Sequence, residues 1–115
     1  MNEKEAVLAL AALAQDSRLA VFRLLVKRGP EGYPAGEIGA RLRIPGPTLS
    51  FHLKELATAG LVAARKDGRF IHYSPKFKHM RALVSYLTDN CCSLAATCAP
   101  ECATPVVTRR RRKAA

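Results

Sequence analysis

Residues 47–60, PTLSFHLKELATAG, decide the fold of this chain. Leu49, Leu53 and Leu56 recur at helical spacing, so one side of a helix here faces an apolar core. Proline at the first helical turn and a glycine after the last turn favour a helix that ends at Gly60. The other side carries Thr48, Ser50, Phe51, His52, Lys54 and Glu55. The pattern fits an ordinary surface helix or a helix that presents polar groups to a partner, and its neighbours favour the second.

A short helix is predicted just before this stretch. Residues 35–43, AGEIGARLR, place Ile38 and Leu42 on one side, and the sequence IPGP at 44–47 forms a tight turn. Two helices around a glycine-containing turn are typical of a helix-turn-helix, whose second helix enters the major groove of DNA. A β-hairpin is predicted next, over residues 61–73, with Asp67-Gly68 as its two-residue turn. A hairpin in this position is a wing whose basic tip can contact phosphates.

Three further helices complete the predicted fold, which is mainly α with a β-hairpin wing. Residues 3–14 form an apolar first helix, and residues 17–28 form a second one that begins at a cap from Asp16 or Ser17 and turns Leu19, Phe22, Leu25 and Val26 inward. Residues 76–90 form a last helix with Met80, Leu83, Val84 and Leu87 on one face. The surplus apolar surface of the first and last helices predicts a homodimer, whose two recognition helices would match an inverted repeat in DNA; closure of the monomer core is the alternative.

Charge and composition favour a polyanionic partner. The net charge of the 115 residues is +10, of which the run RRRRK at 109–113 supplies five, and the remainder still has more basic than acidic residues. No apolar run approaches a membrane span of about 18 residues, and the start of the chain does not resemble a signal peptide. The protein is therefore expected to be cytoplasmic. It lacks a nucleophile–base pair and a phosphate-cradling loop, so an enzyme, with a thiol-dependent activity, is the remote alternative.

The runs LAQDSRLAVFRLL, LSFHLKELATAGLV and ARKDGRFIHYS closely resemble the ArsR/SmtB family of metalloregulatory winged helix-turn-helix repressors. The resemblance spans roughly residues 5–92, which implies a DNA-binding and dimerisation domain over 1–92 and a flexible, basic, cysteine-containing tail over 93–115. It also implies a homodimer, formed through the first and last helices, that an inducing ion releases from double-stranded operator DNA.

Two ligand sets of that family are missing from this chain. The segment GEIGARLRI at 36–44 contains no cysteine, whereas many arsenic sensors of the family carry a cysteine pair there. The zinc sensors place paired Asp and His residues along the last helix. His79 and Asp89 lack that paired spacing, so a zinc site between protomers is not expected, and His79 is expected to be solvated or to cap a helix.

All four cysteines instead follow the last helix, at Cys91, Cys92, Cys98 and Cys102. Thiolates select soft ions, and As(III) or Sb(III) suits three thiolates arranged as a pyramid. The set NCC-x5-C resembles one branch of the arsenic sensors in the family, which implies that Cys91, Cys92 and Cys98 are the ligands and Cys102 a possible fourth. Zinc held by four thiolates, and redox sensing through a disulfide or persulfide, are the alternatives. No organic cofactor is expected.

The expected DNA contacts fall on the recognition helix and the wing. Thr48, Ser50 and His52 would reach base edges or phosphates, and Phe51 could touch a thymine methyl group. His52 could instead be a packing or capping residue. Phosphate contacts are expected from the basic side chains Lys54, Arg65, Lys66 and Arg69.

Overall fold

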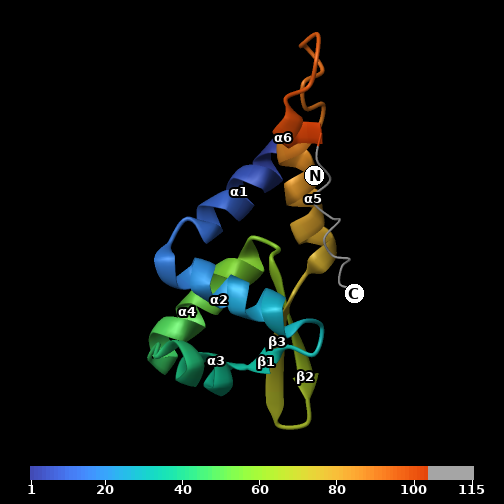
Figure 1. Ribbon diagram of the computed structural model, residues 1–115. Coiled ribbons are helices and arrows are strands. Elements are labelled where there is room, and N and C mark those ends of the chain that lie inside the picture. Colours follow the sequence, from blue (N-terminus) through green and yellow to red (C-terminus); the bar gives the residue numbers. More distant parts are fainter. Residues whose placement is uncertain (104–115) are drawn as a thin grey trace.

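The computed structural model of the protein describes residues 1–103, and the basic run at 109–113 lies outside them (Figure 1). The helices and strands, in chain order, are α1 (Glu3–Leu13), α2 (Asp16–Arg28), β1 (Tyr33–Pro34), α3 (Ala35–Leu42), α4 (Gly46–Thr58), β2 (Val62–Asp67), β3 (Phe70–Pro75), α5 (Phe77–Thr88) and α6 (Pro100–Ala103). Within the described range no helix is both long and apolar enough to cross a membrane. Helices α3 and α4 confirm the predicted helix-turn-helix, and strands β2 and β3 confirm the predicted hairpin.

Helix α1 packs through small residues rather than large ones. Its buried positions are Ala6, Ala9 and Ala12, which recur every three residues and let the helix lie close to its neighbours. Asn2 caps the helix through a reciprocal capping box with Glu5. Because the alanines take the inner face, Val7, Leu8 and Leu10 point outward, and Leu13 packs partly against the core.

Helix α2 differs from the prediction at its start and in its buried face. Gln15 is the N-cap, and its side-chain oxygen accepts the N–H of Arg18 at 2.9 Å. The buried residues are Val21, Phe22 and Leu25, whereas Leu19 is 44% exposed. The inward prediction for Leu19 was wrong because the buried face is centred on positions 21, 22 and 25, and position 19 lies beside that face.

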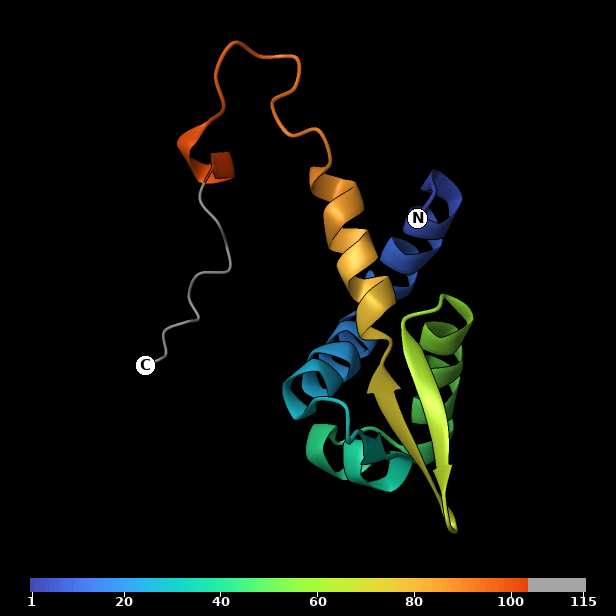
Figure 2. The ribbon, with the colours of Figure 1, turned by 90° about the vertical axis from the view of Figure 1, so that its right-hand side faces the viewer.

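The three strands form one antiparallel sheet in the order β1-β3-β2. Figure 2 shows the β2–β3 hairpin projecting past the helices. Asp67 pairs with Phe70, so the two loop residues are Gly68 and Arg69, one position later than predicted. Gly68 has a φ of +64°, which fits the glycine at the first central position of a type II′ turn. The two-residue strand β1 was not predicted, because it is too short to show a period.

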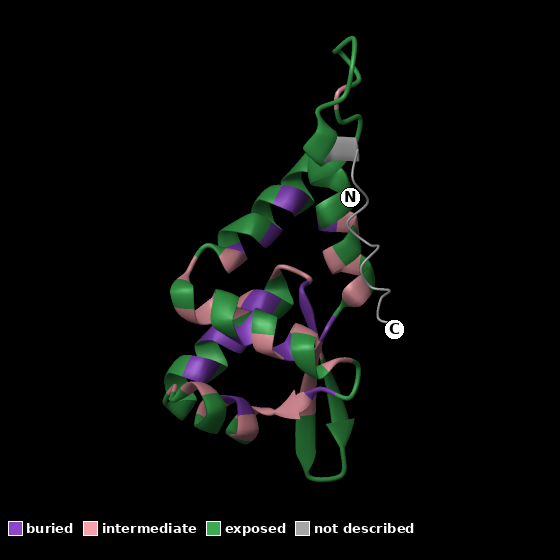
Figure 3. Ribbon diagram, in the orientation of Figure 1, coloured by how far each residue is buried: buried purple, intermediate pink, exposed green. Residues whose placement is uncertain are grey.

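Large apolar side chains remain exposed on α1 and α5. On α1 these are Val7, Leu8 and Leu10, and on α5 they are Val84 and Leu87. On α5 only Leu83 is buried, and Met80 packs partly against the core. Figure 3 shows the outer faces of both helices as exposed. The described chain thus leaves uncovered the surplus apolar surface that the sequence predicts on these two helices.

Gly32 lies where β3 passes the turn that follows α2. Its φ is +72°, and a Cβ atom at this position would collide with the carbonyl oxygen of Tyr73 in β3. Gly68 also has a positive φ, but a Cβ there would meet no atom within 4 Å. The two glycines therefore share a conformational requirement and differ in the space around them.

We expect Gly32→Ala to destabilise the protein more than Gly68→Ala. The left-handed backbone alone costs about 1–2 kcal/mol for an alanine, and the collision with β3 adds about 1–3 kcal/mol of overpacking. Urea unfolding of both variants measures the difference in the free energy of unfolding. Equal losses would show that the approach of β3 to Gly32 is not as close as described.

Candidate nucleic-acid interface and cysteine cluster

Helix α4 has a buried face and an exposed face. Leu49, Leu53 and Leu56 are all buried, as predicted. The polar face exposes Thr48, Ser50 and Lys54, and Phe51 lies with them at 55% exposure. Pro45 precedes the helix and Gly60, with a φ of +81°, follows its end. Four of the residues predicted to contact DNA from α4 are thus available on its surface.

His52 does not share that exposed face. It is only 7% exposed, and its Nδ1 lies 3.4 Å from Nη1 of Arg18 on α2. The reason is its position: residue 52 is three after Leu49 and four before Leu56, so it lies on the same side of the helix as the buried leucines. The prediction that His52 reaches bases or phosphates was wrong, and the alternative of a packing histidine is what the structure supports.

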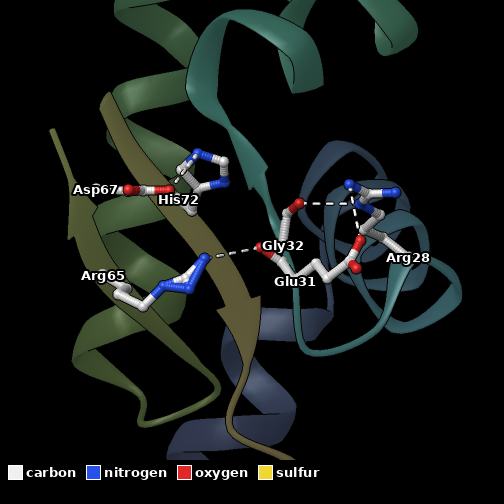
Figure 4. Close-up of polar contacts among 6 residues, drawn as sticks. All are labelled: Arg28, Glu31, Gly32, Arg65, Asp67 and His72. Carbon is white, nitrogen blue, oxygen red and sulfur yellow. Dashed lines mark hydrogen bonds and ion pairs between the residues drawn. The ribbon is translucent and has the colours of Figure 1, made fainter. Parts of the chain in front are cut away.

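The wing carries basic residues near its tip, and one of them also makes a contact within the protein. Arg65, Lys66 and Arg69 are exposed. Arg65 also donates from Nη2 to the carbonyl oxygen of Glu31 at 3.1 Å, which ties β2 to the turn after α2 (Figure 4). Phe70, next to the turn, is 61% exposed. Arg65 therefore has a structural contact in addition to any it makes with phosphate.

The turn that receives Arg65 is held from the other side by Arg28. Its Nε donates to the carbonyl oxygen of Gly32 at 3.0 Å, and its Nη2 lies 3.1 Å from the carboxylate of Glu31 (Figure 4). The guanidinium of Arg28 also lies 4.8 Å from the ring centroid of Tyr33 in β1. Sequence reasoning missed this support, whose only signal was a pair of opposite charges on either side of Gly29-Pro30.

Three cysteines gather directly after α5. The sulfur atoms of Cys91, Cys92 and Cys98 all lie within 4.8 Å of one another, and those of Cys91 and Cys92 are 3.8 Å apart. The described backbone leaves the helix here, with φ of +60° at Asn90 and +64° at Cys92. On a continuous helix adjacent side chains point about 100° apart, so this turn is what lets neighbouring cysteines face one point. The side chain of Cys102 lies outside the described part of the chain.

His79 on α5 is half-buried rather than solvated. Its ring packs over Gly60, where an added Cβ atom would lie 3.1 Å from Nε2. Its contact with Gly60 assigns it a packing role in place of the solvated or capping role that was expected. It lies near the start of α5, and Asp89 directly follows the end of that helix.

The sequence and fold of the chain are similar to those of known transcriptional regulators. A family of helix-turn-helix domains matches residues 13–65. The transcriptional activator HlyU of Vibrio cholerae is 30% identical over 86 residues, which cover 75% of this chain and 77% of HlyU. The uncharacterized HTH-type regulator YceK of Bacillus subtilis is 47% identical over 58 residues, which cover 50% of this chain and 57% of YceK. The chain thus spans little more than half the length of YceK.

Solved structures of transcriptional regulators are also similar in fold to this chain. An ArsR-like transcriptional regulator from Rhodococcus sp. RHA1 has a TM-score of 0.64 at 25% identity and covers 73% of this chain and 76% of its own. The homodimeric winged helix-turn-helix DNA-binding domain of Mb0332 from Mycobacterium bovis, a possible ArsR-family regulator, has a TM-score of 0.62 at 28% identity, with coverage of 76% and 81%. A possible transcriptional regulator for arsenical resistance has a TM-score of 0.56 at 30% identity, with coverage of 70% and 83%.

Taken with the hairpin that follows α4, these matches define a winged helix-turn-helix transcriptional regulator. The chain belongs to the ArsR/SmtB family of such regulators.

The cysteine geometry predicts a disulfide within one chain. Sulfur atoms within 4.8 Å need only a small movement to bond, whereas a bond between the adjacent Cys91 and Cys92 would be strained. Mild oxidation of the reduced protein should therefore join Cys98 to Cys91 or Cys92, as peptide mapping by mass spectrometry after alkylation will show. In Cys98→Ser, the thiols of Cys91 and Cys92 should remain reduced after the same oxidation and should therefore be alkylated. Alkylation of all three thiols in the oxidised wild type would contradict the described cluster.

Proposed function

We propose that the protein is an arsenite- or antimonite-responsive transcriptional repressor. It binds operator DNA as a homodimer in the cytoplasm and leaves the DNA when As(III) or Sb(III) binds Cys91, Cys92 and Cys98. The observation that carries this proposal is the approach of three thiol sulfurs to within 4.8 Å of one another. Repression is itself part of the proposal. The similar protein HlyU is an activator, so the comparison with HlyU does not decide between repression and activation.

The donor set fits a soft ion that prefers three sulfur ligands. Two sulfur atoms bound to one ion are separated by at most twice the metal–sulfur bond length. For zinc this limit is about 4.6 Å. The described sulfurs are already close to that separation, so they need little rearrangement to share an ion. Cys91 and Cys98 are exposed and Cys92 is half-buried, which leaves the cluster accessible from solvent. The similar structure of a possible transcriptional regulator for arsenical resistance supports arsenic over zinc.

The proposed DNA surface combines α4 with the wing. Thr48, Ser50 and Phe51 on the exposed face of α4 would contact base edges and thymine methyl groups in the major groove. The basic side chains that would contact phosphates are Lys54, Arg65, Lys66 and Arg69. Arg65 can serve both roles, because a guanidinium has five N–H donors and the contact with Glu31 uses only one.

The proposed dimer uses the exposed apolar faces of α1 and α5. Val7 and Leu8 on α1 and Val84 and Leu87 on α5 are all more than half exposed in the single chain. Covering such side chains in a symmetric interface removes apolar area from water. The homodimeric state of Mb0332 supports this assembly. A two-fold dimer presents two recognition helices to an inverted repeat.

Arsenite should release the protein from DNA. Fluorescence anisotropy of a labelled duplex from the upstream region of the gene follows binding of the reduced protein, and arsenite is then titrated in. We expect a loss of affinity of roughly 5- to 150-fold, the usual range for coupling between two sites. The response should disappear in Cys91→Ser, Cys92→Ser and Cys98→Ser and persist in Cys102→Ser, which serves as the matched control.

Parallel titrations with zinc and with a mild oxidant distinguish the alternatives. Release by zinc alone, or by the oxidant alone, would replace arsenic sensing by zinc or redox sensing on the same fold. DNA binding that none of the three affects would contradict a sensory role for the cysteines. Absence of DNA binding in any titration would contradict the proposed regulator itself.

The wing contacts should show in the salt dependence of DNA binding. Lys66→Ala and Arg69→Ala each remove two phosphate contacts from a dimer, so the slope of log K against log salt should fall in magnitude by about 2. Arg23→Ala is the matched control, since it removes an exposed cation from α2, which lies outside the helix and hairpin proposed to contact DNA and outside the helices proposed to form the dimer. Equal slopes for all three variants would exclude the wing from the phosphate contacts.

A further inference from the structure

Arg18 makes the polar connection between three helices. It lies in the first turn of α2, and its Nε donates to the carbonyl oxygen of Ala12 in the last turn of α1 at 2.6 Å. Its Nη1 lies 3.4 Å from Nδ1 of His52 on the buried side of α4. A single guanidinium thus touches both the helix proposed to form the dimer interface and the proposed recognition helix.

The chemistry of this contact fixes an orientation. A guanidinium only donates, so Nδ1 of His52 accepts, and the proton of a neutral imidazole is then on Nε2. The N–H donors of arginine point in fixed directions in one plane, which restricts where both acceptors can lie. Neither partner is acidic, so the contact contributes directional hydrogen bonding in place of charge pairing. The His52 ring in turn lies 5.9 Å from that of exposed Phe51, centroid to centroid.

We infer that Arg18 is a positioning residue for DNA recognition, which holds α4 at a fixed orientation relative to α1 through Ala12 and His52. The inference rests on the proposed function, because the orientation matters only if α1 lies in a dimer interface and α4 lies on DNA. In such a dimer the orientation of α4 relative to α1 sets the separation of the two recognition helices. Arg18, which need not contact DNA, then determines which half-site spacing the dimer accepts.

The consequence is a defined preference for operator spacing. Adjacent base pairs are 3.4 Å apart along the duplex, so a spacer changed by one base pair moves one half-site by that distance and also rotates it about the axis. A dimer with firmly oriented recognition helices rejects the changed spacing. A dimer in which α4 can move relative to α1 tolerates it.

The experiment measures a ratio of affinities. An inverted-repeat duplex is selected by wild-type protein from random sequence, and its central spacer is then shortened or lengthened by one base pair. Arg18→Gln should lower the preference for the selected spacing over the altered ones by roughly tenfold, which corresponds to 1.4 kcal/mol. Arg23→Gln, the same substitution at an exposed position of α2, is the matched control and should leave the ratio unchanged.

Two substitutions of His52 test the same contact without removing the arginine. Asparagine places its side-chain oxygen near the position of Nδ1, whereas the longer glutamine places it farther from the backbone. His52→Asn should therefore retain the spacing preference and His52→Gln should lose it. Circular dichroism and urea unfolding show whether each variant is folded at the temperature of the binding measurement, and this pair keeps the test available if Arg18→Gln is unfolded.

The outcomes separate the inference from the proposed function. If wild-type protein binds no duplex selectively, the proposed function fails and the inference fails with it. If wild type shows a spacing preference and Arg18→Gln and His52→Gln keep it, the inference alone is overturned. A uniform loss of affinity for all spacings would also overturn it, because that is the effect of lower stability and not of a changed orientation.

Discussion

The burial of one face of α4 is the constraint on which the rest of the structure depends. Leu49, Leu53 and Leu56 are each at most 3% exposed, and their contacts with the core fix the rotation of the helix about its own axis. That rotation determines which side chains are presented outward, since positions 48, 50, 51 and 54 then have no other direction available. It also brings His52 inside, where Arg18 supplies the hydrogen bond that a buried ring nitrogen needs.

Helix α1 shows how the same core leaves surface for assembly. An alanine every three residues lets α1 approach α2 and α4 closely, so Leu13 is the one large side chain of α1 that packs against the core. Val7, Leu8 and Leu10 are left on the outside. Had the leucines of α1 been buried, the chain would have gained core at the expense of that outer surface.

Much of this architecture was predictable from the sequence because the relevant signals are local. The leucine spacing of α4, the glycine at its end and the turn sequence of the hairpin each depend on a few neighbouring residues. The error at His52 was also local, because position 52 lies three after Leu49 and four before Leu56 and so belongs to the buried leucine face. Tertiary contacts decide the other differences, since β1 exists only because β3 pairs with Tyr33 and Pro34. The proximity of Cys98 to Cys91 depends on a backbone turn with positive φ at Asn90 and Cys92, which no periodicity reveals.

The cysteine cluster and the recognition surface lie at opposite ends of the molecule (Figure 1), so coupling between them requires an element that both ends contact. Helix α5 is that element: its last turn leads into the cysteines, and its first turn meets the segment that follows α4. There Lys76 donates its backbone N–H to the carbonyl oxygen of Leu61 at 2.8 Å, and His79 packs against Gly60. An added Cβ atom at Gly60 would lie only 3.1 Å from Nε2 of His79, so α5 packs closely against the segment that directly follows the recognition helix. The proposed release from DNA therefore requires α5 to have a second position, to which an ion at the cysteines binds with a different affinity.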